Sequence, residues 1–555
     1  GADAVIALAT LSIAWTQFGD GRFLPEGGVR FTAPYASEAL FHSAIAQELR
    51  HHLPIEMPAG LTLPYHVGYN LLAALTADAT GADMLDVHYR LLPILLAPLA
   101  ALSAIAFVES IGAAGLAALA GAAALFFIDD LSWIFGVLGI GHGRSWNLRL
   151  GVPLLYGLHH NRGFLAGVAL LFPAMIVAAR YLRDGRSRDL AVAAALSAAL
   201  FELKVSFFLT LVPAIAAGAG LAAVSGRGGS AHSLLVRGAA LCGMAAALVL
   251  PLVLPILGGS RNALALAPLE VALLPLIRLG AVPGDPIHGA TSGEIGLAPR
   301  LAGLFLLVVG TLGVRALGFS ALADERRRDQ SGIWLAIGVV AVGAAAITLA
   351  TTPPAQLNVV YFWGASLAVL AVLAGIVAAE ALGRMRLRAR SMMALALAVL
   401  ALPGTVQFLW VERSVRARAV LTMPSGSEEI VRLLGREAHP GDVLLEPPGR
   451  ISLLAALVPV RPVIAWPQWF ANTFGEEAIQ ARLDDAAVFF SAAEATKREA
   501  VIDRYRVRWV WAPRGAECVP FARLTLVAEN AAGRLFSVRA LTESRVGARD
   551  LPRSS

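Results

Sequence analysis

The chain has 555 residues, of which 57% are hydrophobic and only 15% charged, whereas a soluble domain carries about 25% charged residues. This composition excludes an ordinary soluble protein and indicates a membrane protein. The net charge of +6 is no evidence for a nucleic-acid partner, because the location of positive charge matters more than its sum. Two separated cysteines, Cys242 and Cys518, predict neither a disulfide nor a cysteine metal cluster.

Apolar runs along the chain predict about eleven transmembrane helices, each long enough to approach the thickness of a bilayer. The first run, GADAVIALATLSIAW, lacks the basic region and cleavage site of a signal peptide, and is interpreted as a processed or truncated first helix. The predicted spans are residues 2–17, 91–110, 112–128, 163–181, 189–203, 205–224, 238–257, 300–319, 332–350, 362–382 and 392–410.

Short arginine-dense segments predict the orientation. They occupy residues 180–189, 225–237, 323–332 and 383–391. With eleven spans they all fall on one side, which the positive-inside bias makes cytoplasmic. The longer loops then lie outside, in particular residues 18–88 and 129–162, together with everything after Trp410. We therefore expect a multi-pass membrane protein whose long loops and last part are extracytoplasmic.

The last part of the chain predicts a small extracytoplasmic α/β domain, so the expected division is a transmembrane module at 1–410 and a soluble domain at 411–555. Helical spacing and buried strand patterns alternate there. The expected helices are 427–438, 476–490 and 492–505, and the expected strands are 441–448, 460–466, 507–513, 523–529 and 534–541. No glycine-rich phosphate loop follows a strand, which argues against a nucleotide site in this domain.

The segment YASEALFHSAIAQELRHHLP in the first outer loop predicts an amphipathic helix lying along the membrane surface. Its apolar stripe is expected at Leu40, Phe41, Ala44, Ile45 and Leu49, and its polar face at Ser37, Gln47, Arg50 and His51. Glu38 and His42 are neighbours across one helical turn, and His66 follows in LPYHVGYN. A carboxylate and imidazoles in one loop suit general acid–base work. The alternative is ordinary polarity at the headgroup boundary.

The second outer loop begins with Asp129 and Asp130, and two adjacent carboxylates can bind a hard divalent cation. The alternative is a helix end marked by solvated acids. The same loop ends with His159, His160 and Arg162.

Lys204, in FELKVSF between two apolar runs, is a candidate for binding an anionic headgroup or phosphate. A short turn whose charges reach the interface is the alternative. Tyr361 and Asn358 are weaker candidates for touching substrate, because aromatic residues at that depth also anchor a helix at the interface. No GxSxG, HExxH or P-loop motif is present, which argues against ATP-driven transport.

This layout resembles the GT-C superfamily of membrane glycosyltransferases. Members share a long first outer loop with helices along the membrane and an acidic residue, a second acidic motif near the third span, and often an outer soluble domain. Here SEALFHSAIAQEL and LPYHVGYN match the loop helices, and Asp129-Asp130 match the second motif. Glu38 stands where the closest pattern, Asp-x-x-Phe-His, has Asp, so Asp20 in TQFGDGRF is the other candidate for the base.

The resemblance implies a sugar donor carried on polyprenyl phosphate, displaced directly at its anomeric carbon. Glu38 or Asp20 would take the proton of the acceptor, which is a glycan, lipid or protein. Asp129 and Asp130 would hold Mg²⁺ or Mn²⁺ or orient the acceptor. Lys204 would stabilise the departing phosphate, together with outer-loop side chains, for which the candidates are His66, His159, His160, Arg162 and Tyr361.

Two other functions remain open at this point. A transporter or flippase for a lipid-linked substrate would require polar residues deep in several spans and an inverted repeat, and the sequence shows few of the former and none of the latter. A non-catalytic subunit that keeps the fold is the third hypothesis, and the departure at Glu38 is the feature that keeps it open.

Overall fold

The structure is a computed structural model, which divides into two compact units that are described separately. The helical unit is Gly1–Phe18, Arg90–Leu257 and Asn262–Ala417, and the mixed unit is Gly19–Tyr89, Gly258–Arg261 and Arg418–Ser555. The residues described are 1–18, 21–23, 29–30, 36–141, 150, 154–226, 230–259, 265–285, 289–290, 295–325, 327, 330–351, 359–416, 424–449, 451–491, 494–516, 518 and 520–539.

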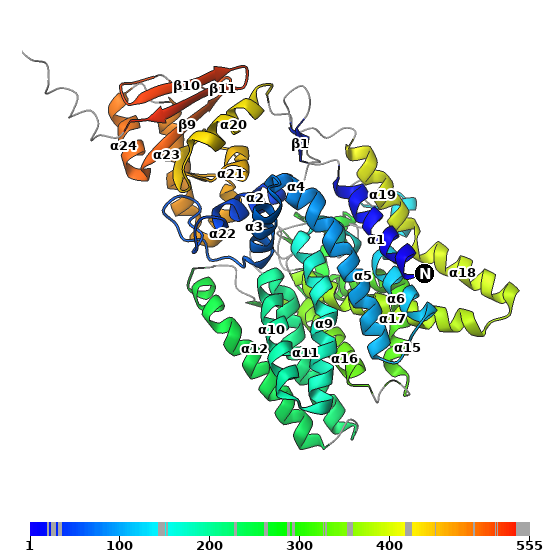
Figure 1. Ribbon diagram of the computed structural model, residues 1–555. Helices are drawn as coiled ribbons and strands as arrows, with labels where there is room; N and C mark the ends of the chain where they lie inside the picture. Colours follow the sequence, from blue (N-terminus) through cyan, green and yellow to red (C-terminus); the bar gives the residue numbers. More distant parts are fainter. Residues whose placement is uncertain are drawn as a thin grey trace, which may run out of the picture. The chain divides into compact units, whose positions relative to one another are not determined.

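The helical unit is a bundle of apolar helices (Figure 1). Its helices are α1 (Ala2–Gln17), α5 (Leu92–Ser110), α6 (Leu116–Phe127), α7 (Ser132–Val137), α8 (Leu154–His160), α9 (Arg162–Asp184), α10 (Ser187–Leu203), α11 (Val205–Val224), α12 (Ala231–Gly259), α13 (Leu274–Arg278), α14 (Leu297–Leu312), α15 (Gly318–Ala323), α16 (Ser331–Leu349), α17 (Val360–Arg384), α18 (Leu387–Ala401) and α19 (Pro403–Arg416), with 3-10 turns η3 (Val271–Leu273) and η4 (Gly313–Leu317). Two-residue strands pair β3 (Ala265–Leu266) with β6 (Ala350–Thr351) and β4 (Gly284–Asp285) with β5 (Gly289–Ala290).

Within the described residues, seven helices are long and apolar enough to cross a bilayer. The pair Leu387–Ala401 and Pro403–Val411, bent by 44°, makes an eighth if the two helices form one span. The protein is therefore a multi-pass membrane protein. A helix occupies every predicted span, but α1, α6 and α10 have only 16, 12 and 17 residues. At 1.5 Å per residue α6 is about 18 Å long, less than the roughly 30 Å hydrocarbon core, so fewer full-length spans form than the eleven expected.

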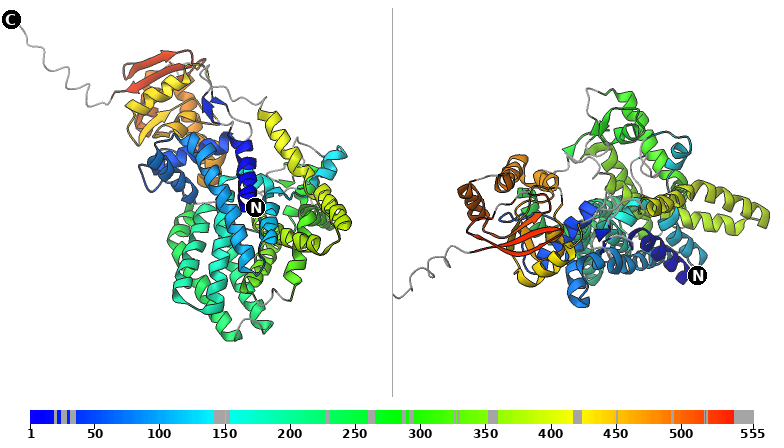
Figure 2. Two further views of the ribbon diagram at one scale, coloured as in Figure 1. Left: turned by 45° about the vertical axis from the view of Figure 1, so that its right-hand side comes forward. Right: turned by 90° about the horizontal axis from the view of Figure 1, so that it is seen from above.

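Small residues let the central helices approach closely, as is usual between membrane helices. A Cβ at Gly375 of α17 would lie 2.3 Å from the carbonyl oxygen of Ala120 in α6, and one at Gly338 of α16 would lie 2.3 Å from that of Ala214 in α11. By contrast, α18 extends away from the other helices of this unit (Figure 2), and Ala401 is its only buried residue.

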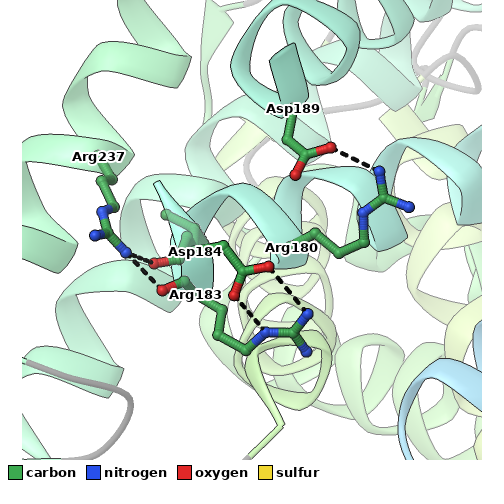
Figure 3. A network of polar contacts seen from close by, with 6 residues as sticks. Arg180, Arg183, Asp184, Asp189 and Arg237 are labelled. Atoms are coloured by element: carbon green, nitrogen blue, oxygen red, sulfur yellow. Dashed lines mark hydrogen bonds and ion pairs between the residues drawn. The ribbon is translucent and has the colours of Figure 1, made fainter. Parts of the chain in front are cut away.

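Ion pairs order the predicted basic turn between α9 and α10 (Figure 3). Arg180 pairs with Asp189 at 2.6 Å, and Arg183 with Asp184 at 2.8 Å. Arg237 of α12 donates to two carbonyl oxygens at the end of α9, at 2.8 and 2.7 Å. Because these oxygens have no partner inside the helix, the guanidinium both caps α9 and ties α12 to it.

The mixed unit contains a five-stranded sheet of order β10-β11-β9-β7-β8. Its strands are β7 (Asp442–Leu445), β8 (Val460–Pro462), β9 (Val507–Pro513), β10 (Leu524–Asn530) and β11 (Gly533–Val538), and its helices are α20 (Ser427–Glu437), α21 (Leu453–Leu457), α22 (Pro467–Phe474), α23 (Glu476–Ser491) and α24 (Ala495–Tyr505). β7 is parallel to β8 and β9, and the other pairs are antiparallel. The predicted α/β character and the eight predicted segments are confirmed, whereas α21 and α22 were not predicted.

Residues of the first loop belong to this same unit. They form β1 (Arg22–Phe23), β2 (Val29–Arg30), α2 (Ala36–Leu49), α3 (Gly68–Thr80), α4 (Met84–Asp86) and the start of the π-helix η1 (Val87–Leu91). The apolar stripe of α2 is buried in a core that contains Trp466 and Phe470, and Gln47 is buried as well. The expectation that this stripe faces lipid is therefore wrong: protein side chains cover it.

Glu446 follows β7 directly, and its Oε2 atom is buried without a hydrogen-bond partner among the described residues. Burial raises the pKa of Glu446 from 4.5 to about 7, against the opposing effect of the Ser452 hydroxyl. Because the folded state binds this proton more tightly than the unfolded chain, the stability of the mixed unit should fall as the pH rises from about 4.5 to about 7.

Glu446→Gln should remove this loss. Since the residue as a whole is partly exposed, we expect the variant to be more stable than the parent by about 1–3 kcal/mol at pH 8 and nearly equal to it at pH 4.5. Unfolding followed by tryptophan fluorescence at both pH values measures the difference. Glu428→Gln, at a surface pair, is the control, and an equal gain at both pH values would contradict the assignment.

Candidate functional site

Two groups of polar side chains, one in each unit, contain most of the predicted site residues. In the mixed unit the centre is His42 of α2. Its Nδ1 lies 3.0 Å from Oδ1 of Asn70 in α3, and its Nε2 lies 3.9 Å from Oε1 of Glu38 one turn earlier. The Nδ1 side of the ring thus meets Asn70, and Nε2 is turned toward the carboxylate. The predicted Glu38–His42 pair is thus brought together, and Asn70 sets the direction of the ring.

Further aromatic and imidazole rings surround this pair. Tyr65 lies 6.1 Å from the ring of His42 and stacks on His66 at 4.2 Å. Tyr69 of α3 shares a 3.1 Å hydrogen bond with Nδ1 of His88 in η1. His88 is completely buried. Sequence reasoning did not single it out, although a histidine just before an apolar run is a signal.

The other candidate base, Asp20, lies outside the described residues, as does Asn358.

In the helical unit the second group forms around Lys204, in the break between α10 and α11. Its Nζ lies 3.8 Å from the centre of the Tyr361 ring. The Tyr361 hydroxyl accepts a 3.3 Å hydrogen bond from Nδ2 of Asn161, whose Oδ1 caps α9 through the amide of Phe164. The predicted residues Lys204 and Tyr361 therefore meet, and Asn161 fixes the tyrosine. The Lys204 ammonium is thereby held over the face of an aromatic ring.

The histidines that precede Asn161 are also ordered. Nδ1 of His159 lies 2.9 Å from the hydroxyl of Thr16 in α1, and Gln17 donates to the His159 carbonyl. The rings of His159 and His160 both meet Phe408 of α19 edge-on, at 5.2 and 5.5 Å. Both are buried, and so is Arg162.

If the chain catalyses the phosphate-releasing transfer that its sequence layout predicts, Lys204→Met should lower kcat by about 10²–10³-fold, because one donor to a developing negative charge is removed. Lys497→Met, at an exposed pair in α24, is the matched control. Steady-state release of the lipid phosphate measures the effect. Wild-type turnover in Lys204→Met would contradict the assigned role.

Asp129 and Asp130, directly after α6, are fully buried rather than exposed in an outer loop. Oδ1 of Asp130 accepts a hydrogen bond from the amide of Ser132 at 2.9 Å. Gly404 lies close to Asp129, because a Cβ added at Gly404 would be only 2.3 Å from Oδ2 of Asp129. The side chain of Arg315 in η4 is also completely buried.

Arg315 donates to the carbonyl oxygens of Ile128 and Thr311, and its charge acts favourably on both carboxylates. Arg315 falls inside the predicted span 300–319 but was not among the predicted site residues. An arginine within an apolar run nevertheless indicates a buried partner.

The residues around Asp129 and Asp130 do not form a complete metal site by themselves. Mg²⁺ is commonly held by one or two carboxylates together with waters and substrate phosphates, and the described part of the chain holds no group of three or more His, Cys, Asp or Glu side chains suited to a metal. The buried guanidinium supplies positive charge to the pair. The predicted Mg²⁺ or Mn²⁺ site therefore stays a prediction.

No protein-family model and no curated protein sequence matches this chain. Among solved structures, the archaeal oligosaccharyltransferase AglB from Archaeoglobus fulgidus, in complex with an inhibitory peptide and a dolichol-phosphate, is similar with a TM-score of 0.50 at 12% identity, over 92% of this chain and 69% of that one. The apo form of the Archaeoglobus fulgidus enzyme gives 0.49 at 13% identity, with the same coverage.

The mycobacterial arabinofuranosyltransferase AftD gives a TM-score of 0.48 at 15% identity, over 97% of this chain and 40% of that one. Another structure of the Archaeoglobus fulgidus oligosaccharyltransferase, in complex with zinc and sulfate, gives a TM-score of 0.47 at 12% identity, over 92% of this chain and 68% of that one. The likeness to the peptide- and dolichol-phosphate-bound enzyme extends over both units. The chain therefore has the GT-C fold of membrane glycosyltransferases, as its sequence layout predicted.

Proposed function

We propose that this protein is a membrane glycosyltransferase that moves a sugar from a polyprenyl-phosphate-type lipid to an acceptor at the outer face of a bacterial inner membrane. The observation that carries the proposal is the fold, which the chain shares over 92% of its length with an oligosaccharyltransferase solved with a dolichol-phosphate. The Glu38–His42 pair and the Lys204–Tyr361 pair contain the residue types that proton removal and phosphate binding use.

The chemistry assigned to the mixed unit is removal of a proton. Glu38, with Asp20 as the alternative, takes the proton from the acceptor hydroxyl or amine as its oxygen or nitrogen attacks the anomeric carbon. His42, held by Asn70 with Nε2 toward Glu38, restrains the carboxylate. A general base of this kind contributes about 10²–10⁴ to the rate.

The chemistry assigned to the helical unit is stabilisation of the leaving group. As the bond between the anomeric carbon and the phosphate oxygen breaks, negative charge grows on the lipid phosphate. Lys204 on the Tyr361 ring meets that charge, assisted by Arg162 and the neighbouring histidines. Low surrounding polarity strengthens such contacts. No step is assigned to a metal ion.

The orientation proposed for this chemistry follows from charge. By the positive-inside bias we place the arginine-rich turn of Arg180, Arg183 and Arg237 (Figure 3) at the cytoplasmic end, and we place the proposed transfer at the outer face. A lipid carrier is required there because nucleotide sugars are cytoplasmic.

The test is release of free lipid phosphate. The full chain in lipid nanodiscs is mixed with synthetic polyprenyl-phosphate hexoses and pentoses and with short glycan, lipid or peptide acceptors. Release that depends on the acceptor supports the proposal. Sealed vesicles provide the second arm: translocation of the donor without release would identify a flippase, and the absence of both would identify a non-catalytic subunit. Either result overturns the proposal.

A further inference from the structure

We infer that Arg461, on β8 of the C-terminal sheet, is a positioning residue for the Glu38–His42 pair, acting through Glu48 and Glu56 of the first loop. The inference rests on the proposed function, because it concerns the placement of the proposed base. It assigns to the C-terminal residues a part in the transfer step itself, by holding α2 in place.

Arg461 is separated from its two partners by more than four hundred residues of sequence. Its Nε and Nη2 donate to Oε1 of Glu48 at 2.8 and 2.7 Å, and its Nη1 donates to Oε2 of Glu56. Only 13% of the arginine side chain and 6% of the Glu48 side chain are exposed. Charge-assisted bonds at such low exposure are strong and directional. Removal of Arg461 takes away the closest counter-charge of the buried Glu48 carboxylate and leaves it with His52, whose Nδ1 lies 3.7 Å away.

Other side chains of α2 also contact the C-terminal residues. Gln47 donates to the carbonyl oxygen of Leu457 at 3.0 Å. Phe41, directly before His42, meets the rings of Trp466 and Phe470 edge-on, at 5.7 and 5.8 Å. These packing contacts resist separation of the helix from the sheet domain. Apolar packing is not directional. The ion pairs of Arg461 are directional, and they fix the rotation of α2 about its axis and its position along the sheet domain.

Glu38 lies on the same helix as Glu48, ten residues or about 15 Å along its axis. A helix transmits a change at one end to the other, so a loosened Glu48 displaces Glu38. A misplacement of about 1 Å at a reacting group costs about 100-fold in rate. Arg461 thereby controls kcat without touching substrate.

The experiment compares Arg461→Met with Glu48→Gln, the double variant and Arg432→Met, all in the full-length protein. Arg432 pairs with Glu428 on the exposed face of α20, with 72% of its side chain exposed, and is the control. Amide hydrogen exchange reports how firmly α2 is held, and lipid-phosphate release reports turnover. Arg461→Lys, which keeps the charge and loses the fork, covers the case in which the methionine variant does not fold.

In Arg461→Met we expect exchange within residues 36–49 to rise about tenfold, with β9 to β11 unchanged. We expect kcat to fall about 100-fold while KM stays within about twofold. The double variant should be no worse than either single variant, since both remove one contact. Arg461→Lys should lie between Arg461→Met and the parent, and Arg432→Met should match the parent.

Three results would overturn the inference: unchanged exchange in α2, increased exchange throughout the sheet, which would mean a general loss of stability, or an unchanged kcat despite loosened α2. Failure of the proposed function looks different, because the unaltered protein itself would then release no lipid phosphate. In that case the positioning role of Arg461 in the transfer is rejected together with the proposed function, even if hydrogen exchange in α2 changes as expected.

Discussion

Glu38→Gln is expected to lower kcat of the proposed transfer by about 10²–10⁴-fold, since the amide cannot take the acceptor proton. The side chain keeps its size, so the contact with His42 and the burial of α2 should persist. Glu38→Asp should retain part of the activity. The rate of lipid-phosphate release under saturating donor measures each variant, and Glu428→Gln serves as the surface control.

Asp20→Asn belongs in the same series, because the sequence leaves two candidates for the base. A normal rate in Glu38→Gln with a lost rate in Asp20→Asn would assign the base to Asp20. Normal rates in both variants would contradict the acid–base assignment altogether. His42→Gln should have a smaller effect than Glu38→Gln, because His42 restrains the carboxylate instead of taking the proton.

Arg315→Met is expected to destabilise the helical unit by about 3–5 kcal/mol, because it leaves Asp129 and Asp130 buried without their counter-charge. Asp129→Asn in the same background should recover part of this loss by removing one negative charge. The midpoint of thermal unfolding in detergent measures both. Arg300→Met, at the half-buried pair with Glu270, is the control and should cost no more than about 1 kcal/mol.

Metal analysis of the purified protein tests whether Asp129 and Asp130 hold a cation. If Arg315 neutralises the acidic pair, the purified protein should contain no stoichiometric Mg²⁺ or Mn²⁺, and a chelator should leave its unfolding midpoint unchanged. A bound metal that disappears in Asp129→Asn would show that the pair is a metal site after all. An Arg315→Met variant as stable as the parent would show that the guanidinium is not the counter-charge.

Local patterns in the sequence predicted the elements that depend on near neighbours. Residues 427–438 have helical spacing and form α20, and residues 507–513, rich in valine and tryptophan, form β9. The pairing of Glu38 with His42 followed from one helical turn. By contrast α21, only five residues long, gives no periodic signal, because a run shorter than two turns fits a strand or a helix equally.

Contacts between distant residues could not be predicted in this way. The apolar stripe of α2 has the same composition whether lipid or Trp466 covers it, so periodicity identified the stripe and not its partner. Arg315 lies 187 residues from Ile128, and Arg461 lies 413 residues from Glu48. A single sequence does not record which remote side chains meet, and these two arginines were missed for that reason.

The shared core of the first loop and the C-terminal residues has a consequence for biosynthesis. At about 5–20 residues per second, the ribosome makes Arg461 some 20–80 s after Glu48. Throughout that interval the nascent segment around Phe41 lacks the aromatic residues that will cover it, and is exposed to proteases and aggregation. A premature stop codon before β8 would therefore leave the apolar stripe of α2 permanently uncovered.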